Sequence, residues 1–297
     1  MGSDFPVFIL TDSQARVIYR WTGYTGSGRF LNSLNTAKSD MITVDERKAR
    51  LKSKPSLNDA IFLAQYGSDT GDYLDAVAFY RRAEEISNKT RDYSYDIFKA
   101  TANAIWKDMA VFKQIFPAAD AVLNAKRKND GDIIGLARIM GRLARKKEQT
   151  NSIGFYLKAG VEAAQRSRNP NDAENLAVLR ADYALYVDHD TSGALEIRKT
   201  SLGQGWKKKP EKFYNFAKWC AERKINLGEA EFYARESVRL AADNEFKAKV
   251  LFTLAEICHA QGKLDEAISL VDQAIDLDPK QDSFFETLVQ YRLESGK

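Results

Sequence analysis

The sequence predicts a mostly α-helical protein in which short helices pair one after another into a solenoid, behind an N-terminal β-hairpin. Three observations predict this fold. From Ser56 to the end of the chain, apolar residues recur at helical spacing with only short breaks. Small residues recur within that region at roughly constant intervals, which is typical of repeated helix pairs. The first residues have a different period, that of two short strands.

Composition bounds the class of protein. The chain has 297 residues, of which 44% are hydrophobic and 29% are charged, as in globular proteins with a large core. Its net charge of +4 is spread along the chain and does not indicate a nucleic-acid partner. No apolar run approaches the roughly 18 residues of a membrane span, and the N-terminus lacks the features of a signal peptide. As written, the chain is therefore expected to be cytoplasmic or already processed, with no membrane span and no nucleic-acid partner.

The first predicted element is a β-hairpin followed by a helix. Val7–Leu10 is an apolar strand and Val17–Trp21 alternates more, while Asp12 and Ser13 between them suit a chain reversal. Glycines then lead into a helix, for which Ser27 is the predicted N-cap. A two-stranded hairpin is marginal by itself. We therefore expect it either to pack on the first helices or to pair with the hairpin of a second chain, forming a homodimer.

The clearest helix pair lies in residues 248–280. Its first helix has an apolar face, Gly262 is expected to end that helix in a left-handed cap, and Pro279 stops the second helix. Ala255 and Ala267 are small, which lets the two antiparallel helices approach closely.

Weaker copies of this pair recur along the chain, in residues 57–87, 92–126, 132–166, 176–201 and 213–241. The small residues expected early in each second helix are Ala76, Gly154, Ala194, Ala230 and Ala267, with a gap near Ala118 where Pro117 disturbs the pattern. The sequence thus predicts about six pairs. The stretch DSFFETLVQYRLES would be a solitary last helix, because a stack of repeats needs a terminal cap.

The pattern of residues 248–280 resembles a tetratricopeptide repeat, a helix–turn–helix unit of about 34 residues. The resemblance is specific at Ala255–Pro279 and extends more weakly over most of the chain. It implies a tetratricopeptide-like α-α superhelix over residues 56–297, to which residues 39–55 are a helical connection. It also implies a non-catalytic scaffold that binds a protein or peptide partner, with the first helices of the pairs lining a concave groove.

The start of the chain, residues 1–38, resembles the C-terminal part of a thioredoxin domain. The matching features are Pro6 in the place of that family's cis-proline, the two strands, and the glycines Gly23 and Gly28 before a helix through Phe30, Leu31 and Leu34. The family's CxxC would lie upstream of Met1, so Pro6 would have no disulfide to face. The resemblance implies an alternative function, the C-terminal fragment of a thiol–disulfide oxidoreductase, and a bacterial protein that is often exported.

The tetratricopeptide resemblance also implies which side chains face a partner. Carried over residue by residue, the groove would present Lys99, Asn103, Trp106, Arg138, Arg142, Arg145 and Lys146, with Gln65, Asp182 and Lys218 elsewhere along it. The three arginines stand at i, i+4 and i+7 on one helix face, where guanidinium groups favour carboxylates or phosphates. The row resembles the carboxylate clamp of chaperone-tail-binding tetratricopeptide domains, although the clamp's order of lysine and asparagine is not reproduced. Two interpretations stay open, an acidic-peptide site and a solvated basic face.

Other candidate sites have structural explanations. Gly23–Arg29 has three glycines before a helix, but it lacks a GK[ST] motif and is expected to be a strand-to-helix loop. The basic stretch Trp206–Phe213 is expected to be a solvated loop rather than a site for single-stranded nucleic acid. Cys220 and Cys258 are far apart and are expected to be buried structural thiols, and two histidines are too few for a triad or a metal centre. No catalytic residue, cofactor or metal site is predicted.

Three classes of function are therefore compared. The first is an interaction scaffold, which all the repeats favour. The second is the docking arm of a redox enzyme, which a CxxC upstream would indicate. The third is an assembly subunit with the hairpin as its dimer interface, which the oligomeric mass would indicate.

Overall fold

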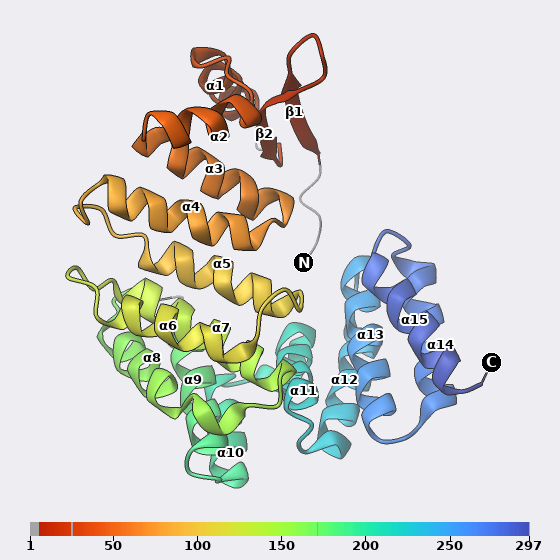
Figure 1. Ribbon diagram of the computed structural model, residues 1–297. Coiled ribbons are helices and arrows are strands. Elements are labelled where there is room, and N and C mark those ends of the chain that lie inside the picture. The colour runs from red at the N-terminus through yellow and green to blue at the C-terminus, as the bar shows by residue number, and fades with distance from the viewer. Residues whose placement is uncertain (1–5, 25, 171, 297) are drawn as a thin grey trace. The chain divides into compact units, whose positions relative to one another are not determined.

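The computed structural model describes residues 6–24, 26–170 and 172–296. Within these residues the protein is helical apart from one β-hairpin, which confirms the predicted fold class (Figure 1). The chain divides after Arg168 into two compact units. None of the helices in the described ranges is both long and apolar enough to cross a bilayer.

The first unit opens with strands β1 (Val7–Thr11) and β2 (Val17–Thr22), which pair antiparallel. Its helices follow in chain order: α1 (Ser27–Ser39), α2 (Val44–Ser53), α3 (Leu57–Thr70), α4 (Tyr73–Ile86), α5 (Ser94–Trp106), α6 (Ile115–Leu123), α7 (Asp130–Lys146) and α8 (Gly154–Arg166). Short 3-10 turns, η1 (Phe112–Gln114) and η2 (Thr150–Ser152), precede α6 and α8.

The second unit contains helices only. They are α9 (Asp172–Tyr186), α10 (Thr191–Ser201), the 3-10 turn η3 (Trp206–Lys208), α11 (Pro210–Arg223), α12 (Leu227–Leu240), α13 (Asn244–Ala260), α14 (Leu264–Leu277) and α15 (Asp282–Glu294).

Every predicted repeat forms a pair of consecutive helices, from α3 with α4 to α13 with α14 (Figure 1). The predicted small residues Ala76, Ala194, Ala230 and Ala267 are fully buried, and each is the fourth residue of its helix. Gly154 is an exception, because it is the first residue of α8. Leu157 takes the buried fourth position there, so α8 has a large side chain where the other second helices have an alanine that permits close approach.

Helix ends follow local chemistry. Gly262 has a φ of 79°, and the N–H groups of Gly262 and Lys263 donate to the carbonyls of His259 and Cys258, which is a Schellman cap. Pro117 lies in the first turn of α6, where a missing N–H breaks no helical bond, so it does not interrupt the repeat. The prediction of Ser27 as an N-cap is wrong. Ser27 is the first helical residue, and Gly26 occupies the cap position. Glycine has no side chain, so it cannot accept a hydrogen bond from the N–H groups of the first turn.

The hairpin packs on the first helices of its own unit. The Asp12 carboxylate accepts hydrogen bonds from the N–H groups of Gln14 and Arg16, both at 2.9 Å, which confirms the predicted reversal. Ile18 is buried, and the rings of Tyr19 in β2 and Phe62 in α3 lie 5.7 Å apart. Ile9 is 55% exposed, so β1 is not covered on both faces as its apolar sequence suggests.

Candidate functional site

The predicted groove residues of the first unit lie on two neighbouring first helices, α5 and α7. Each helix turns an apolar face into the core: the buried residues include Ile97, Phe98, Ala104 and Ile105 in α5, and Ile133, Ile134, Ala137, Met140 and Ala144 in α7. The Asn129 side chain caps α7 by accepting a 2.8 Å hydrogen bond from the N–H of Gly131. The faces that remain outside the core carry the predicted polar and aromatic side chains.

A pocket of about 220 Å³ lies between these faces. Four of the predicted groove residues line it, together with three apolar ones: Lys99, Asn103, Trp106 and Arg142, with Ala102, Ile139 and Leu143. The pocket therefore combines an apolar floor with a polar rim. Such a combination suits an apolar side chain that carries, or stands next to, a polar group.

Two cations from α7 lie within cation–π distance of Trp106. The Arg142 guanidinium lies 5.5 Å and the Lys146 ammonium 4.4 Å from the centre of the Trp106 ring system. Lys146 also donates a 2.7 Å hydrogen bond to the Trp106 carbonyl, which satisfies one of the free carbonyls at the end of α5. These contacts fix the indole at the mouth of the pocket.

The charges around the pocket are unequal. Lys99 is paired with Asp96 at 2.9 Å. Within the described part of the chain, neither Arg138 nor Arg142 has a carboxylate at ion-pair distance, and both side chains are exposed. Burial raises the pKa of Asp132, which is the carboxyl group that lies near Lys99 and Asp96. The α7 side of the site thus presents two guanidinium groups that are available to an anion.

The other predicted groove residues do not join the pocket. Arg138 and Lys146 are exposed beside it and Arg145 is half-buried, so the row of three arginines is not equally open to a partner. Gln65 and Lys218 are exposed on α3 and α11. Pro6 is exposed, and its carbonyl accepts a 2.9 Å hydrogen bond from the N–H of Gly23. Its peptide bond to Phe5, on which the cis-proline prediction depends, lies outside the described residues.

Asp182 was expected in the groove and is instead a core residue of the second unit. Its carboxylate receives two hydrogen bonds, of 2.6 and 2.7 Å, from the guanidinium of Arg223 in α11. The two side chains are only 4% and 2% exposed. Arg223 also lies over the ring of Trp219, 4.6 Å from its centre. The partners stand 41 residues apart in sequence, so no local pattern pointed to this ion pair.

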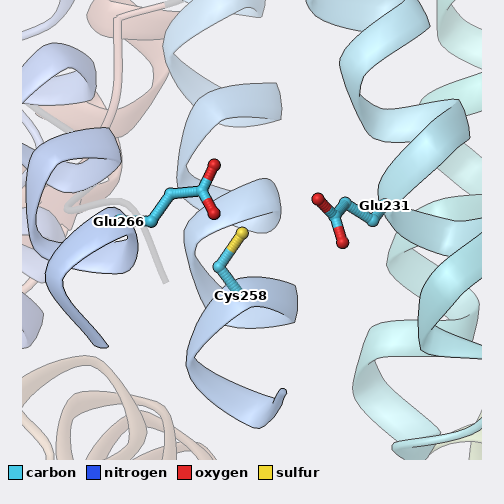
Figure 2. Close-up of side chains that lie close together, drawn as sticks. All are labelled: Glu231, Cys258 and Glu266. Atoms are coloured by element: carbon cyan, nitrogen blue, oxygen red, sulfur yellow. The ribbon is translucent and has the colours of Figure 1, made fainter. Parts of the chain in front are cut away.

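Glu231, Cys258 and Glu266 bring two carboxylates and a thiol close enough together to hold a metal ion (Figure 2). Sequence reasoning missed this cluster because its members come from three helices. The two carboxylates already form ion pairs with two cations. Lys263 lies 2.7 Å from Glu231, and Arg235 lies 2.7 Å from Glu231 and 2.6 Å from Glu266. A divalent cation would have to displace both of them, so the arrangement is best described as an ion-pair network that joins α12, α13 and α14.

Both thiols are buried, as predicted. Burial raises the pKa of Cys220 to about 12 and that of Cys258 to about 11. A thiol with so high a pKa is neutral near pH 7 and is a poor nucleophile and a poor metal ligand.

The loop around Trp206 is also structural. Trp206 is half-buried, and its ring lies 5.6 Å from Phe213 and 4.9 Å from Tyr233. The aromatic ring therefore packs against other aromatic rings of the second unit.

One repeat matches a known family. Residues 248–281, which cover α13 from its fifth residue onward, all of α14 and the four residues after it, match the tetratricopeptide repeat. A search of curated proteins finds no match. The resemblance of residues 1–38 to a thioredoxin domain receives no support from these comparisons.

The solved structures that align with this chain include tetratricopeptide proteins. One is the TPR2AB-domain:pHSP90-complex of yeast Sti1, at 13% identity over 81% of this chain and 98% of that one, with a TM-score of 0.32. Another is YrrB, described as a TPR protein with an unusual peptide-binding site, at 16% identity over 82% and 98%, with a TM-score of 0.34. A third is BtubC (BKLC) from P. vanneervenii, at 11% identity over 79% and 86%, with a TM-score of 0.35. Residues 248–281 are the part of this array of helix pairs that matches the family model.

Proposed function

We propose that the protein is an interaction scaffold and that the α5–α7 pocket binds an acidic segment of a protein or peptide partner. The single observation that carries this proposal is the pocket itself, which Trp106 and Arg142 line, with Arg138 exposed one turn away on the same helix, α7. Guanidinium groups bind carboxylates with two parallel hydrogen bonds, and the apolar floor adds a place for one side chain.

The chemistry of the pocket specifies the kind of peptide. Because the volume is about 220 Å³, it accommodates a single apolar side chain rather than a folded element. An acidic residue within one or two positions of that side chain would reach Arg142 and Arg138 on α7. The favoured ligand is therefore a short extended segment that contains an apolar residue next to glutamate or aspartate.

Peptide binding by charge-reversed variants tests this proposal. A fluorescent peptide panel with the pattern acidic–apolar–acidic is titrated against the full chain, and fluorescence anisotropy reports binding. The double variant Arg138→Glu/Arg142→Glu is expected to weaken binding at least tenfold, since like charges then face the peptide. The affinity of the unchanged chain is expected to fall as salt is raised, because the pair of guanidinium groups is exposed.

The matched control reverses two other exposed cations of the same unit, Arg81→Glu/Lys113→Glu, neither of which lines the pocket. The control changes the net charge by the same amount and should leave the affinity within about twofold of the unchanged chain. Equal affinities for both double variants would show that the basic face of α7 is only solvated, as the alternative interpretation of the sequence holds.

A further inference from the structure

A second cavity of the first unit lies where one helix pair connects to the next. The residues that follow α4 and the residues that follow α6 meet there. They meet because α5 and α6 form a pair, in which the end of α6 returns to the start of α5 (Figure 1). The cavity has a volume of about 1140 Å³, several times that of the α5–α7 pocket. It can therefore hold a molecule with several polar groups.

The walls of this cavity gather four cations from two separate connections. Lys89 and Arg91 follow α4, whereas Lys126 and Arg127 follow α6. All four side chains are exposed. Within the part of the chain that the structure describes, none of the four has a carboxylate at ion-pair distance. Their positive charge is therefore available to a ligand.

Two carboxylates also line the cavity, but both accept hydrogen bonds from the backbone. Glu84 accepts one of 3.3 Å from the N–H of Tyr93, and Asp92 accepts one of 2.9 Å from the N–H of Ser94. These bonds hold the connection in place at the start of α5. With four cations and two carboxylates, the lining side chains keep a net charge of +2. The N-terminal N–H groups of α5 add partial positive charge.

The other wall residues indicate which kind of anion fits. Asn88, Thr90 and Asn124 contribute polar side chains, and two alanines complete the wall. The Tyr93 ring stacks on Tyr80, with 6.0 Å between the ring centres. Recognition in this cavity thus depends on charge and hydrogen bonding, in contrast to the α5–α7 pocket with its apolar floor. Two phosphate groups, each with a charge of about −1.5 to −2 near pH 7 and three acceptor oxygens, match four cations better than carboxylates do.

We propose that this cavity binds a small soluble molecule that carries a cluster of at least two phosphate groups. The guanidinium groups of Arg91 and Arg127 bind phosphate oxygens through paired hydrogen bonds. The ammonium groups of Lys89 and Lys126 act as point charges beside them. The site shares no lining residue with the α5–α7 pocket, so it adds a second ligand to the proposed scaffold.

Isothermal titration calorimetry of the full chain with tripolyphosphate tests the proposal. Saturable binding at micromolar concentrations is expected, and it should weaken as salt is raised. Lys89→Gln/Lys126→Gln should weaken it about tenfold, because two of the four charges are removed. The matched control, Lys107→Gln/Lys113→Gln, makes the same change at two exposed lysines beside the ends of α5 and α6 that lie away from the cavity. It should leave binding within about twofold.

Four results would overturn the proposal. One is the absence of saturation up to about 1 mM tripolyphosphate. Another is an equal loss of affinity in both double variants, because net charge alone would then explain the binding. Citrate that binds as tightly as tripolyphosphate would show that the cavity does not select phosphate. A short oligouridylate that binds more tightly would show that the ligand is an extended nucleic acid. Circular dichroism establishes that each variant remains folded.

The two proposed sites can be tested separately. Lys89→Gln/Lys126→Gln leaves the lining of the α5–α7 pocket intact, so the affinity for the acidic–apolar–acidic peptide should stay within about twofold. Loss of tripolyphosphate binding with retained peptide binding therefore assigns the two ligands to different places on the first unit. A loss of both ligands in this variant would contradict two independent sites.

Discussion

Glu231 shows how one carboxylate joins neighbouring helices. Burial raises the pKa of Glu231, but hydrogen bonds from Lys263 and Arg235 outweigh that effect and bring the pKa to about 2, against an ordinary value of 4.5. The side chain is only 16% exposed, so water screens these contacts weakly. The same contacts account for the Glu231–Cys258–Glu266 cluster without a metal ion.

This depressed pKa predicts a pH dependence of stability. A carboxyl group whose folded-state pKa lies below its unfolded value stabilises the fold fully above the unfolded pKa, and that stabilisation is lost as the pH falls through the folded pKa. For Glu231 the window runs from about pH 5 down to about pH 2, and a difference of this size corresponds to at most about 3 kcal/mol. Glu231→Gln should therefore lower the free energy of unfolding at pH 7 by about 1–3 kcal/mol and flatten its slope within that window.

Urea denaturation at a series of pH values measures this effect. Glu245→Gln on α13 is the control, since it removes an exposed ion pair with Lys249 that should contribute less than about 1 kcal/mol. If Glu231→Gln and Glu245→Gln lose the same stability at pH 7, the ion-pair network around the half-buried Glu231 does not contribute in the way described.

At the scale of elements, helix pairs depend on close backbone approach. In the pair of α3 and α4, Gly67 faces the start of α4. A Cβ atom at Gly67 would lie 3.0 Å from the carbonyl oxygen of Asp72 and 3.1 Å from the backbone nitrogen of Ala76. Both are backbone atoms, which cannot move aside as a flexible side chain can.

Gly67→Ala is therefore expected to destabilise the protein by about 1–3 kcal/mol, because α3 and α4 must separate to admit one methyl group. Gly28→Ala is the matched control. Gly28 is also a helical glycine, but no atom lies within 4 Å of its added Cβ, so alanine should be neutral or stabilise by up to about 1 kcal/mol. Thermal unfolding followed by circular dichroism compares the two, and a neutral Gly67→Ala would contradict the close approach.

The same scale shows what the sequence could predict. Helix pairs were predictable for two reasons. Burial of one helix face imposes a helical period on apolar residues, and helices that cross closely require small residues there, as at Ala76 and Ala267. The prediction for Gly154 was wrong because α8 begins only at this residue, after the turn η2. A small residue at the start of a helix has the same sequence pattern as one at a helix crossing. The repeat pattern placed the predicted groove residues of the candidate site on α5 and α7. It did not predict the burial of Asp182, because its partner Arg223 comes from another helix pair.

In each of the two units, which divide after Arg168, helices pack mainly on the helices next to them in sequence. In such arrays stability is close to a sum of local terms, so a lesion acts mainly on the helices around it. The pocket between the first helices α5 and α7 lies outside the core, so a partner can bind there without altering the packing of the helix pairs.

Because stability is a sum of local terms, a destabilising substitution in one unit should affect mainly that unit. Asp182→Asn removes the carboxylate that pairs with the buried Arg223 guanidinium, which also lies 3.3 Å from Glu222, and should destabilise the second unit by about 3 kcal/mol. Amides of α9 and α11 should then exchange hydrogen roughly 100-fold faster, while amides of α3–α8 keep their rates. Hydrogen exchange read by mass spectrometry resolves the two units, and Asp272→Asn, which removes an exposed pair with Arg292, should change neither. Faster exchange across both units would mean that the chain unfolds as a single cooperative body, because a loss of stability confined to one unit cannot expose the amides of the other.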